Sequence, residues 1–134
     1  MQLRTEQNKL TTTEYQSIRE TTDWCSLKND MVEKALKNDL FSISVYDKDK
    51  LIGIGRVIGD GAIYFYLQDI IVIPEYQNKG IGLLMMEKIE EYFSIAANSN
   101  SFIGLMAAKD VKEFYEKFGY KVRPSDRPGM HKMV

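Results

Sequence analysis

Cysteine, histidine and proline are scarce in this chain of 134 residues, which contains one cysteine, one histidine and three prolines. A single cysteine, Cys25, cannot form an internal disulfide, and disulfide-free chains are typical of reducing compartments. One cysteine and one histidine also cannot supply the usual ligands of a zinc site. We therefore expect a cytoplasmic protein without a metal cofactor.

Long hydrophobic runs and an excess of one charge are also missing. No apolar stretch approaches the ~20 residues of a membrane helix, and the first ten residues lack the apolar segment of a secretory signal. Eighteen basic residues against 19 acidic residues give a net charge of −1. General affinity for nucleic acid or for an anionic membrane is therefore not expected. The remaining composition, 44% hydrophobic and 28% charged, is that of one globular domain, which we expect to span residues 1–134.

The most informative stretch covers residues 67–93, LQDIIVIPEYQNKGIGLLMMEKIEEYF. An apolar run rich in β-branched residues stops at Pro74, and a polar loop with Gly80 and Gly82 leads into a helical pattern. Backbone N–H groups in the first turn of a helix have no intrahelical partner, and the helix dipole adds partial positive charge there. The order strand, glycine turn, helix therefore predicts a phosphate site.

Two other glycine-rich phosphate-binding motifs do not match this stretch. A Walker A loop requires Gly-x-x-x-x-Gly-Lys-Ser/Thr, and no such run is present. A dinucleotide-binding fingerprint requires a third glycine, but position 85 is Met85.

The order of elements predicts an α+β fold. We expect strands over 2–6, 40–46, 51–58, 62–73, 102–107, 120–123 and 130–134, and helices over 11–22, 27–38, 81–93 and 111–118. The apolar end of the strand over 62–73 is typical of a central strand covered on both faces, and the strand after the long helix should lie parallel to it.

Several local features accompany this assignment. Thr12 or Thr13 is expected to cap the first helix, and Met31 and Ala35 to face inward from the second. Gly53 and Gly55, inside a strand, indicate close backbone packing or a bulge. Met85 and Met86 are expected to fill the core.

Three segments and the C-terminal tail carry a family resemblance. Gln77-Asn78-Lys79-Gly80-Ile81-Gly82 resembles the Gln/Arg-x-x-Gly-x-Gly/Ala signature of the GCN5-related N-acetyltransferase (GNAT) superfamily, and Ile73-Pro74-Glu75-Tyr76 precedes it as in that family. Residues 114–120, FYEKFGY, match the later family segment, and the tail resembles that of small bacterial members. The resemblance implies a mixed, mostly antiparallel sheet flanked by helices on both faces. It also implies an enzyme that moves an acetyl group from acetyl-coenzyme A (acetyl-CoA) to a primary amine.

The resemblance also implies where acetyl-CoA binds. The loop would hold the phosphates through its backbone, and the end of the preceding strand would run beside the pantetheine arm, where a bulge or splay opens the sheet. The N–H of Val72 is assigned to the thioester carbonyl. The implied contacts are Ile71, Val72, Ile73, Gln77, Asn78, Lys79, Gly80, Ile81, Gly82, Leu83 and Tyr115.

Tyr115 is the expected general acid, because a phenol with an ordinary pKa near ~10 is protonated at neutral pH and can donate to a departing thiolate. Periodicity alone favours a core position, since residues 111, 114, 115 and 118 form an apolar stripe. The family segment favours the catalytic role. Many members place an asparagine before this helix, whereas this chain has Ala107-Ala108-Lys109, so the backbone or Lys109 would replace that contact.

Asp69 is the candidate general base or holder of the amine. An undistorted strand places it on the same face as Ile71. A structural ion pair is an equally good interpretation. Tyr64, Tyr66 and Gln68 are alternatives on the same strand.

Trp24 is either a wall of the acceptor pocket or, with more weight, a core anchor. Cys25 is expected to be a small buried residue, and the single histidine, His131, to lie on a strand surface. Tyr64 and Tyr66 are further candidates for acceptor contacts.

The favoured hypothesis is direct attack of an amine on acetyl-CoA in a ternary complex. A second hypothesis is a non-catalytic module that senses or binds coenzyme A, and a third treats the glycine loop as turn chemistry in a structural protein. The acceptor is a small-molecule or peptidyl amine, with a cationic small molecule slightly favoured. Homodimerisation through the C-terminal strands is expected by analogy.

Overall fold

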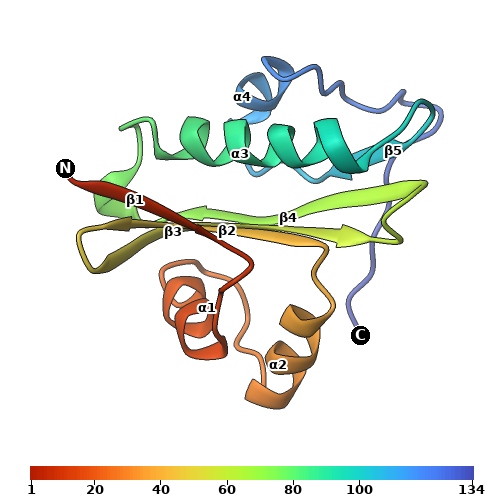
Figure 1. Cartoon of the computed structure of the whole chain (residues 1–134). Helices are drawn as coiled ribbons and strands as arrows, with labels where there is room; N and C mark the ends of the chain where they lie inside the picture. Colours follow the sequence, from red (N-terminus) through yellow and green to blue (C-terminus); the bar gives the residue numbers. More distant parts are fainter.

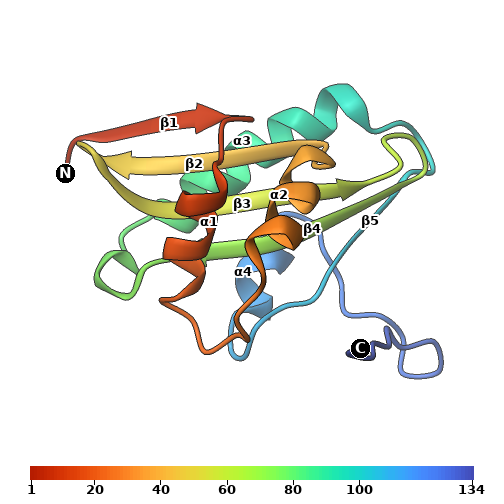
Figure 2. The same ribbon diagram turned by 90° about the horizontal axis from the view of Figure 1, so that it is seen from below.

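The computed structural model describes residues 1–134 and consists of one sheet between two layers of helices (Figure 1). The sheet has five strands in the order β1-β2-β3-β4-β5. Neighbours are antiparallel except β4 and β5, which are parallel. Helices α1 and α2 cover one face, as Figure 2 shows, and α3 and α4 cover the other. The predicted α+β architecture is confirmed.

The strands are β1 (Leu3–Gln7), β2 (Phe41–Asp47), β3 (Lys50–Gly59), β4 (Tyr64–Val72) and β5 (Phe102–Leu105). The helices are α1 (Thr12–Arg19), α2 (Asn29–Lys37), α3 (Ile81–Ala96) and α4 (Lys112–Glu116), with a short 3₁₀ turn, η1 (Pro74–Tyr76), before the glycine loop. Every element predicted before residue 119 is present, and β5 lies parallel to β4 as expected.

Two details of the N-terminal helices differ from the prediction. Thr11, and neither Thr12 nor Thr13, caps α1, because its hydroxyl accepts from the Glu14 N–H while the Glu14 side chain accepts from the Thr11 N–H. In α2 the buried side chain is Val32, whereas Met31 is 60% exposed. An error of one position rotates a helix by ~100°, which is enough to exchange an inner face for an outer one.

The core lies between the sheet and the helices on its two faces. Met85 and Met86 are fully buried on α3, which confirms their expected place in the core. Gly55 permits close packing here, since a Cβ atom on it would lie 2.7 Å from the Ile70 side chain and 3.2 Å from that of Ile89.

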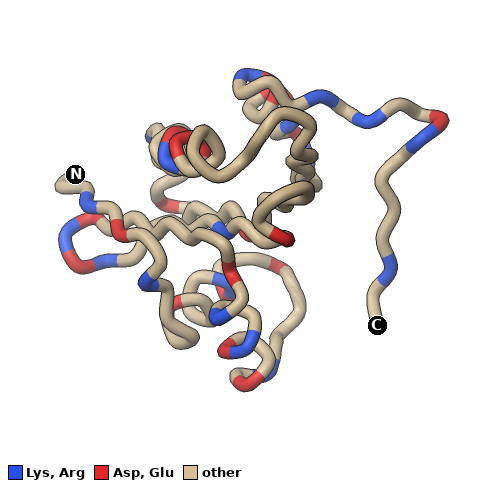
Figure 3. The backbone as a smooth tube through the Cα atoms, turned by 45° about the vertical axis from the view of Figure 1, so that its right-hand side comes forward, with Lys and Arg blue, Asp and Glu red and all other residues tan.

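The two C-terminal strands predicted over 120–123 and 130–134 are wrong. The chain after α4 contains no helix or strand, and the tail extends away from the body of the protein (Figure 3). Val122, Met130 and Met133 are exposed, and His131 lies in this tail and not on a strand. Alternating apolar residues form a strand only where a partner strand accepts their hydrogen bonds, and none lies beside this segment. None of the helices has the length and apolar character required to cross a membrane.

Candidate active site

Strand β4 has neighbours on both edges in its first half and on one edge in its second half. Tyr64–Leu67 pairs with β5, and the pairing stops there, whereas pairing with β3 continues to Val72. The sheet therefore opens between β4 and β5 beyond Leu67. This opening is the splay that the resemblance implied.

A β-bulge lies at the start of the open half. Gly55 of β3 is opposite two residues of β4, Asp69 and Ile70, where a regular ladder has one. Asp69 adopts a left-handed backbone conformation with φ of 55°. The strand is therefore distorted at Asp69, and the undistorted pleat expected there is wrong.

The bulge reverses which backbone groups of β4 face β3. Before the bulge, the Tyr64 carbonyl accepts from the Asp60 N–H, so even-numbered residues point toward β3. After it, the Ile73 N–H donates to the Ile52 carbonyl, so odd-numbered residues point that way. Val72 consequently directs its N–H away from β3, toward the open edge.

The loop between η1 and α3, together with the first turn of α3, presents a row of free N–H groups. None of the backbone N–H groups of residues 78–83 donates a hydrogen bond within the protein. Asn78 and Gly80 have positive φ values of 61° and 84° on either side of Lys79. When the sign of φ alternates along the chain in this way, successive N–H groups point toward one concave surface, which can bind an anion. Here that surface lies at the N-terminus of the 16-residue helix α3.

The two glycines of the loop have different surroundings. A Cβ atom on Gly80 would meet nothing within 4 Å, so the space in front of it is open. A Cβ atom on Gly82 would lie 3.4 Å from the ring of Phe114. Helix α4 therefore contacts the glycine loop directly, which the sequence pattern did not predict.

Side chains of the loop attach it to neighbouring strands. The Gln77 side chain donates to the Val72 carbonyl at 3.0 Å, and the Tyr76 hydroxyl donates to Asp47 at 2.6 Å. The Lys79 ammonium lies 5.4 Å from the centre of the Tyr76 ring. These contacts fix the loop against the end of β4.

Tyr115 lies on α4 beside Phe114, the residue that contacts the glycine loop. Its ring packs edge-on against the Phe114 and Tyr120 rings, with centroid distances of 5.2 and 6.3 Å. Burial raises the pKa of Tyr115 above its ordinary value of 10.0. The phenol is therefore protonated at neutral pH, as a proton donor must be.

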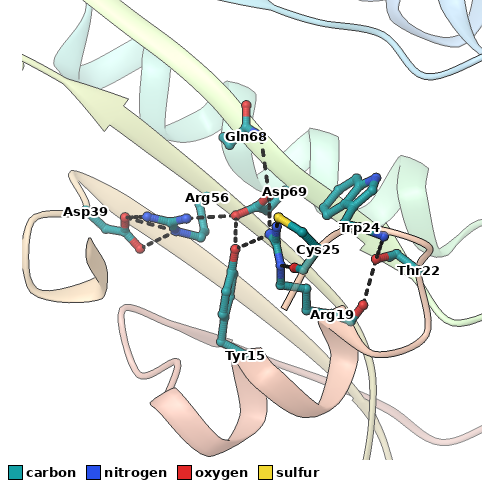
Figure 4. Close-up of polar contacts among 9 residues, drawn as sticks. All are labelled: Tyr15, Arg19, Thr22, Trp24, Cys25, Asp39, Arg56, Gln68 and Asp69. Carbon is teal, nitrogen blue, oxygen red and sulfur yellow. Dashed lines mark hydrogen bonds and ion pairs between the residues drawn. The ribbon is translucent and has the colours of Figure 1, made fainter. Parts of the chain in front are cut away.

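Asp69 belongs to a buried network of charges on the α1 side of the sheet (Figure 4). Its side chain is 3% exposed and accepts from the Tyr15 hydroxyl at 2.6 Å and from Arg56 at 2.7 Å. Arg56 also forks onto Asp39. A carboxylate held by these donors is poorly placed to receive a proton from an amine, so the geometry favours the ion-pair interpretation of Asp69.

The residues expected near the acceptor lie at or near the surface. Trp24 is 42% exposed in the loop between α1 and α2, with the Arg19 guanidinium 5.3 Å from its ring centre, so it is not a core anchor. Cys25 is exposed, contrary to expectation. Tyr64 is exposed, and Tyr66 lines a groove of about 840 Å³ that is formed mainly by β5, α4 and the C-terminal tail. The structure does not bring these aromatic residues into one pocket.

Sequence reasoning missed most of the Asp69 network. Tyr15, Arg19, Asp39 and Arg56 were not singled out, because Asp69 lies 13 to 54 positions away from them in the chain. One signal was present: Arg56 is the only charged residue within the apolar run LIGIGRVIG of β3. A charge inside a central strand requires a buried partner. The described residues contain no group of three or more histidines, cysteines and acids that could hold a metal.

Comparisons with known proteins agree with this fold and site. Residues 9–129 match the family model described as an acetyltransferase (GNAT) domain. A solved structure of a probable acetyltransferase from meticillin-resistant Staphylococcus aureus superposes with a TM-score of 0.91 at 33% identity, covering 98% of this chain and 99% of that one. A GNAT family acetyltransferase from Streptococcus pneumoniae gives 0.82 at 25% identity, with 98% of each chain covered.

A curated relative gives the same result. An uncharacterized N-acetyltransferase, ycf52, from Pyropia yezoensis is 28% identical over 121 residues, which are 87% of this chain and 68% of the relative. The chain belongs to the GNAT acetyltransferase family and is an N-acetyltransferase, a class that uses acetyl-CoA as cosubstrate. The relatives are not confined to bacteria, so the bacterial origin expected from the tail is not established.

Proposed function

We propose that this protein transfers the acetyl group of acetyl-CoA to a primary amine by direct attack in a ternary complex. The observation that carries the proposal is the row of six free N–H groups at 78–83, next to a strand half whose Val72 N–H faces an open edge. The row suits a pyrophosphate. The open edge suits the amide groups of a pantetheine arm, which would pair along Ile71–Ile73 as another strand would.

In the proposed reaction, the amine, the Val72 N–H and Tyr115 each have one role. The amine nitrogen attacks the thioester carbon, and the Val72 N–H donates to the carbonyl oxygen as negative charge develops there. The carbon–sulfur bond then breaks, and Tyr115 donates its proton to the departing thiolate. The nitrogen releases its extra proton to water. Asp69 is not used as the base, because its carboxylate is enclosed.

The coenzyme contacts of the proposal are Ile71, Val72, Ile73, Gln77, Asn78, Lys79, Gly80, Ile81, Gly82, Leu83 and Tyr115. The acceptor is proposed to be a small-molecule amine that enters near Trp24, whose exposed ring can pack against a cation. Tyr64 and Tyr66 lie on the half of β4 that pairs with β5, before the splay, and are weaker candidates for contacts with the acceptor.

A homodimer is also proposed. The outer edge of β5 has no strand beside it, and the exposed tail carries apolar residues that such an edge can bind. Light scattering of the full chain should give twice the monomer mass, and a monomer at all concentrations would contradict this part.

Calorimetric titration with acetyl-CoA tests the coenzyme site. The wild type should bind at micromolar strength or better. Gly80→Asn and Gly80→Asp are matched variants, since both residues tolerate positive φ and the space at position 80 is open. Only the aspartate places a negative charge against the phosphates, so it should weaken binding at least about tenfold more than the asparagine does.

Turnover then separates the possible outcomes. A panel of amines with a thiol-release readout should identify an acceptor for the wild type. Binding of acetyl-CoA without turnover on any amine would favour a non-catalytic coenzyme A module. Absence of binding would contradict the proposed site altogether.

A further inference from the structure

The bulge in β4 requires a conformation that most residues avoid. Asp69 has φ of 55°, a left-handed conformation that costs a non-glycine residue free energy, although aspartate tolerates it better than most. Glycine would adopt this conformation without strain. The aspartate side chain must therefore contribute something that offsets the backbone cost.

The contacts of Asp69 supply that contribution. The Tyr15 hydroxyl and the Arg56 guanidinium both donate to the same carboxylate oxygen, at 2.6 and 2.7 Å. These three residues are 3–7% exposed, so the contacts are shielded from water. They tie the bulge to α1 through Tyr15 and to β3 through Arg56.

The bulge determines which backbone group reaches the open edge. It inserts one residue into β4. Because of this single insertion, odd-numbered residues, and no longer even-numbered ones, direct their backbone N–H and C=O groups toward β3. Without it, Val72 would turn its N–H toward β3, and the N–H groups of Ile71 and Ile73 would face the opening. The contacts of Asp69 therefore control the group to which the proposed function assigns the thioester carbonyl.

The same network continues to the surface. Arg19 donates to the Tyr15 hydroxyl at 3.0 Å and to the Cys25 carbonyl at 3.1 Å, and it lies against Trp24. Helix α1 thus connects the bulge to the loop that carries the exposed tryptophan (Figure 4).

We propose that Asp69 is a positioning residue, whose contacts with Tyr15 and Arg56 hold the β4 bulge and thereby aim the Val72 N–H at the acetyl-CoA thioester. This inference rests on the proposed function. It replaces a role in proton transfer with a role in backbone geometry.

A matched pair of tyrosine variants tests it. Tyr15→Phe removes the hydroxyl that donates to Asp69, and Tyr46→Phe removes the hydroxyl that donates to Glu14, the residue before Tyr15 on α1. Each loses one phenol–carboxylate hydrogen bond to the same helix. Tyr15→Phe should lower both acetyl-CoA affinity and kcat by about fivefold, while Tyr46→Phe should leave both unchanged.

Two readouts separate positioning from general destabilisation. Amide exchange of Ile73, whose N–H donates to Ile52 beyond the bulge, should accelerate in Tyr15→Phe and not in Tyr46→Phe in the protein without ligand. Asp69→Asn, which keeps the left-handed preference, should retain more activity than Asp69→Ala. Its pH–rate profile should keep the wild-type shape.

Three results would overturn the inference. Equal effects of the two tyrosine variants would mean that the bulge contact has no special role. Loss of the acidic limb of the pH–rate profile in Asp69→Asn, with acetyl-CoA affinity intact, would identify Asp69 as the base. Failure of the wild type to bind acetyl-CoA would instead remove the proposed function, and this inference with it.

Discussion

In the first half of β4, residues 64–67, a strand lies on each side, whereas the second half, residues 68–72, has β3 on one side and an open edge on the other. The side chains differ in the same way. Phe65 and Leu67 in the first half are apolar and buried, while the second half contains the buried, ion-paired Asp69. Backbone groups that the fold leaves unpaired are available to a ligand, so the half-paired part of β4 is the part to which the proposed function assigns acetyl-CoA.

Truncation of one side chain in each half tests this comparison most directly. Leu67→Ala should destabilise the protein by about 2–5 kcal/mol, because it leaves a cavity in the core. Val72→Ala, at a half-buried site, should cost about 1 kcal/mol. Urea unfolding measures both, and equal losses would show that the two halves contribute alike to stability.

Removal of the proposed acid should have the next largest effect. Tyr115→Phe should lower kcat about 100-fold and change acetyl-CoA affinity far less, because the ring that contacts the coenzyme remains and only the proton donor to the departing thiolate is lost. The matched control is Tyr120→Phe, whose hydroxyl donates to Glu90 at 3.0 Å, and its kcat should change by less than about threefold. Equal losses in the two variants would contradict the role of Tyr115.

The pH–rate profile gives a second check on this acid. An acid works only while protonated, so its activity is lost as pH rises through its pKa. Burial raises the pKa of Tyr115 above 10.0, and the alkaline limb due to this group should therefore lie above about pH 10. A limb assigned to Tyr115 at neutral pH would contradict its burial.

Release of the loop from β4 should have a smaller effect. Gln77→Ala removes the hydrogen bond to the Val72 carbonyl, worth about 1 kcal/mol, so acetyl-CoA should bind about fivefold more weakly. Gln16→Ala is the control, because it also loses a side-chain bond to a carbonyl, that of Leu27 at 2.7 Å, and lies far from the loop in sequence. A weaker affinity in both variants would point to stability and not to the loop.

The smallest expected effect concerns alkaline stability. Burial, together with the hydrogen bond to Asp69, raises the pKa of Tyr15 to about 12 from 10.0. A raised folded-state pKa gives stability that is complete below pH 10 and is lost as pH rises toward 12. The difference in thermal midpoint between wild type and Tyr15→Phe should therefore shrink between pH 10 and pH 12, and a constant difference would contradict this.

Local signals were sufficient for the elements and for the glycine loop. The periodicity of α3, the stop at Pro74 and the turn residues act over a few positions, and each element predicted up to residue 118 is present. Errors arose where the outcome depended on distant partners. The tail was predicted to form strands, yet no strand lies beside it, and Trp24 and Cys25 were placed in the interior without knowledge of what covers their loop.

The sequence by itself determined the α+β order of elements, the loop with free N–H groups and the family to which the chain belongs, because these depend on residues close together in the chain. Only the tertiary structure shows the contacts and the bulge at Asp69 on which its proposed positioning role rests. Its partners Tyr15 and Arg56 come from α1 and β3, and the bulge depends on how β4 pairs with β3 across Gly55. Such pairings depend on burial and register, which follow from the packing of the whole sheet and not from any single segment.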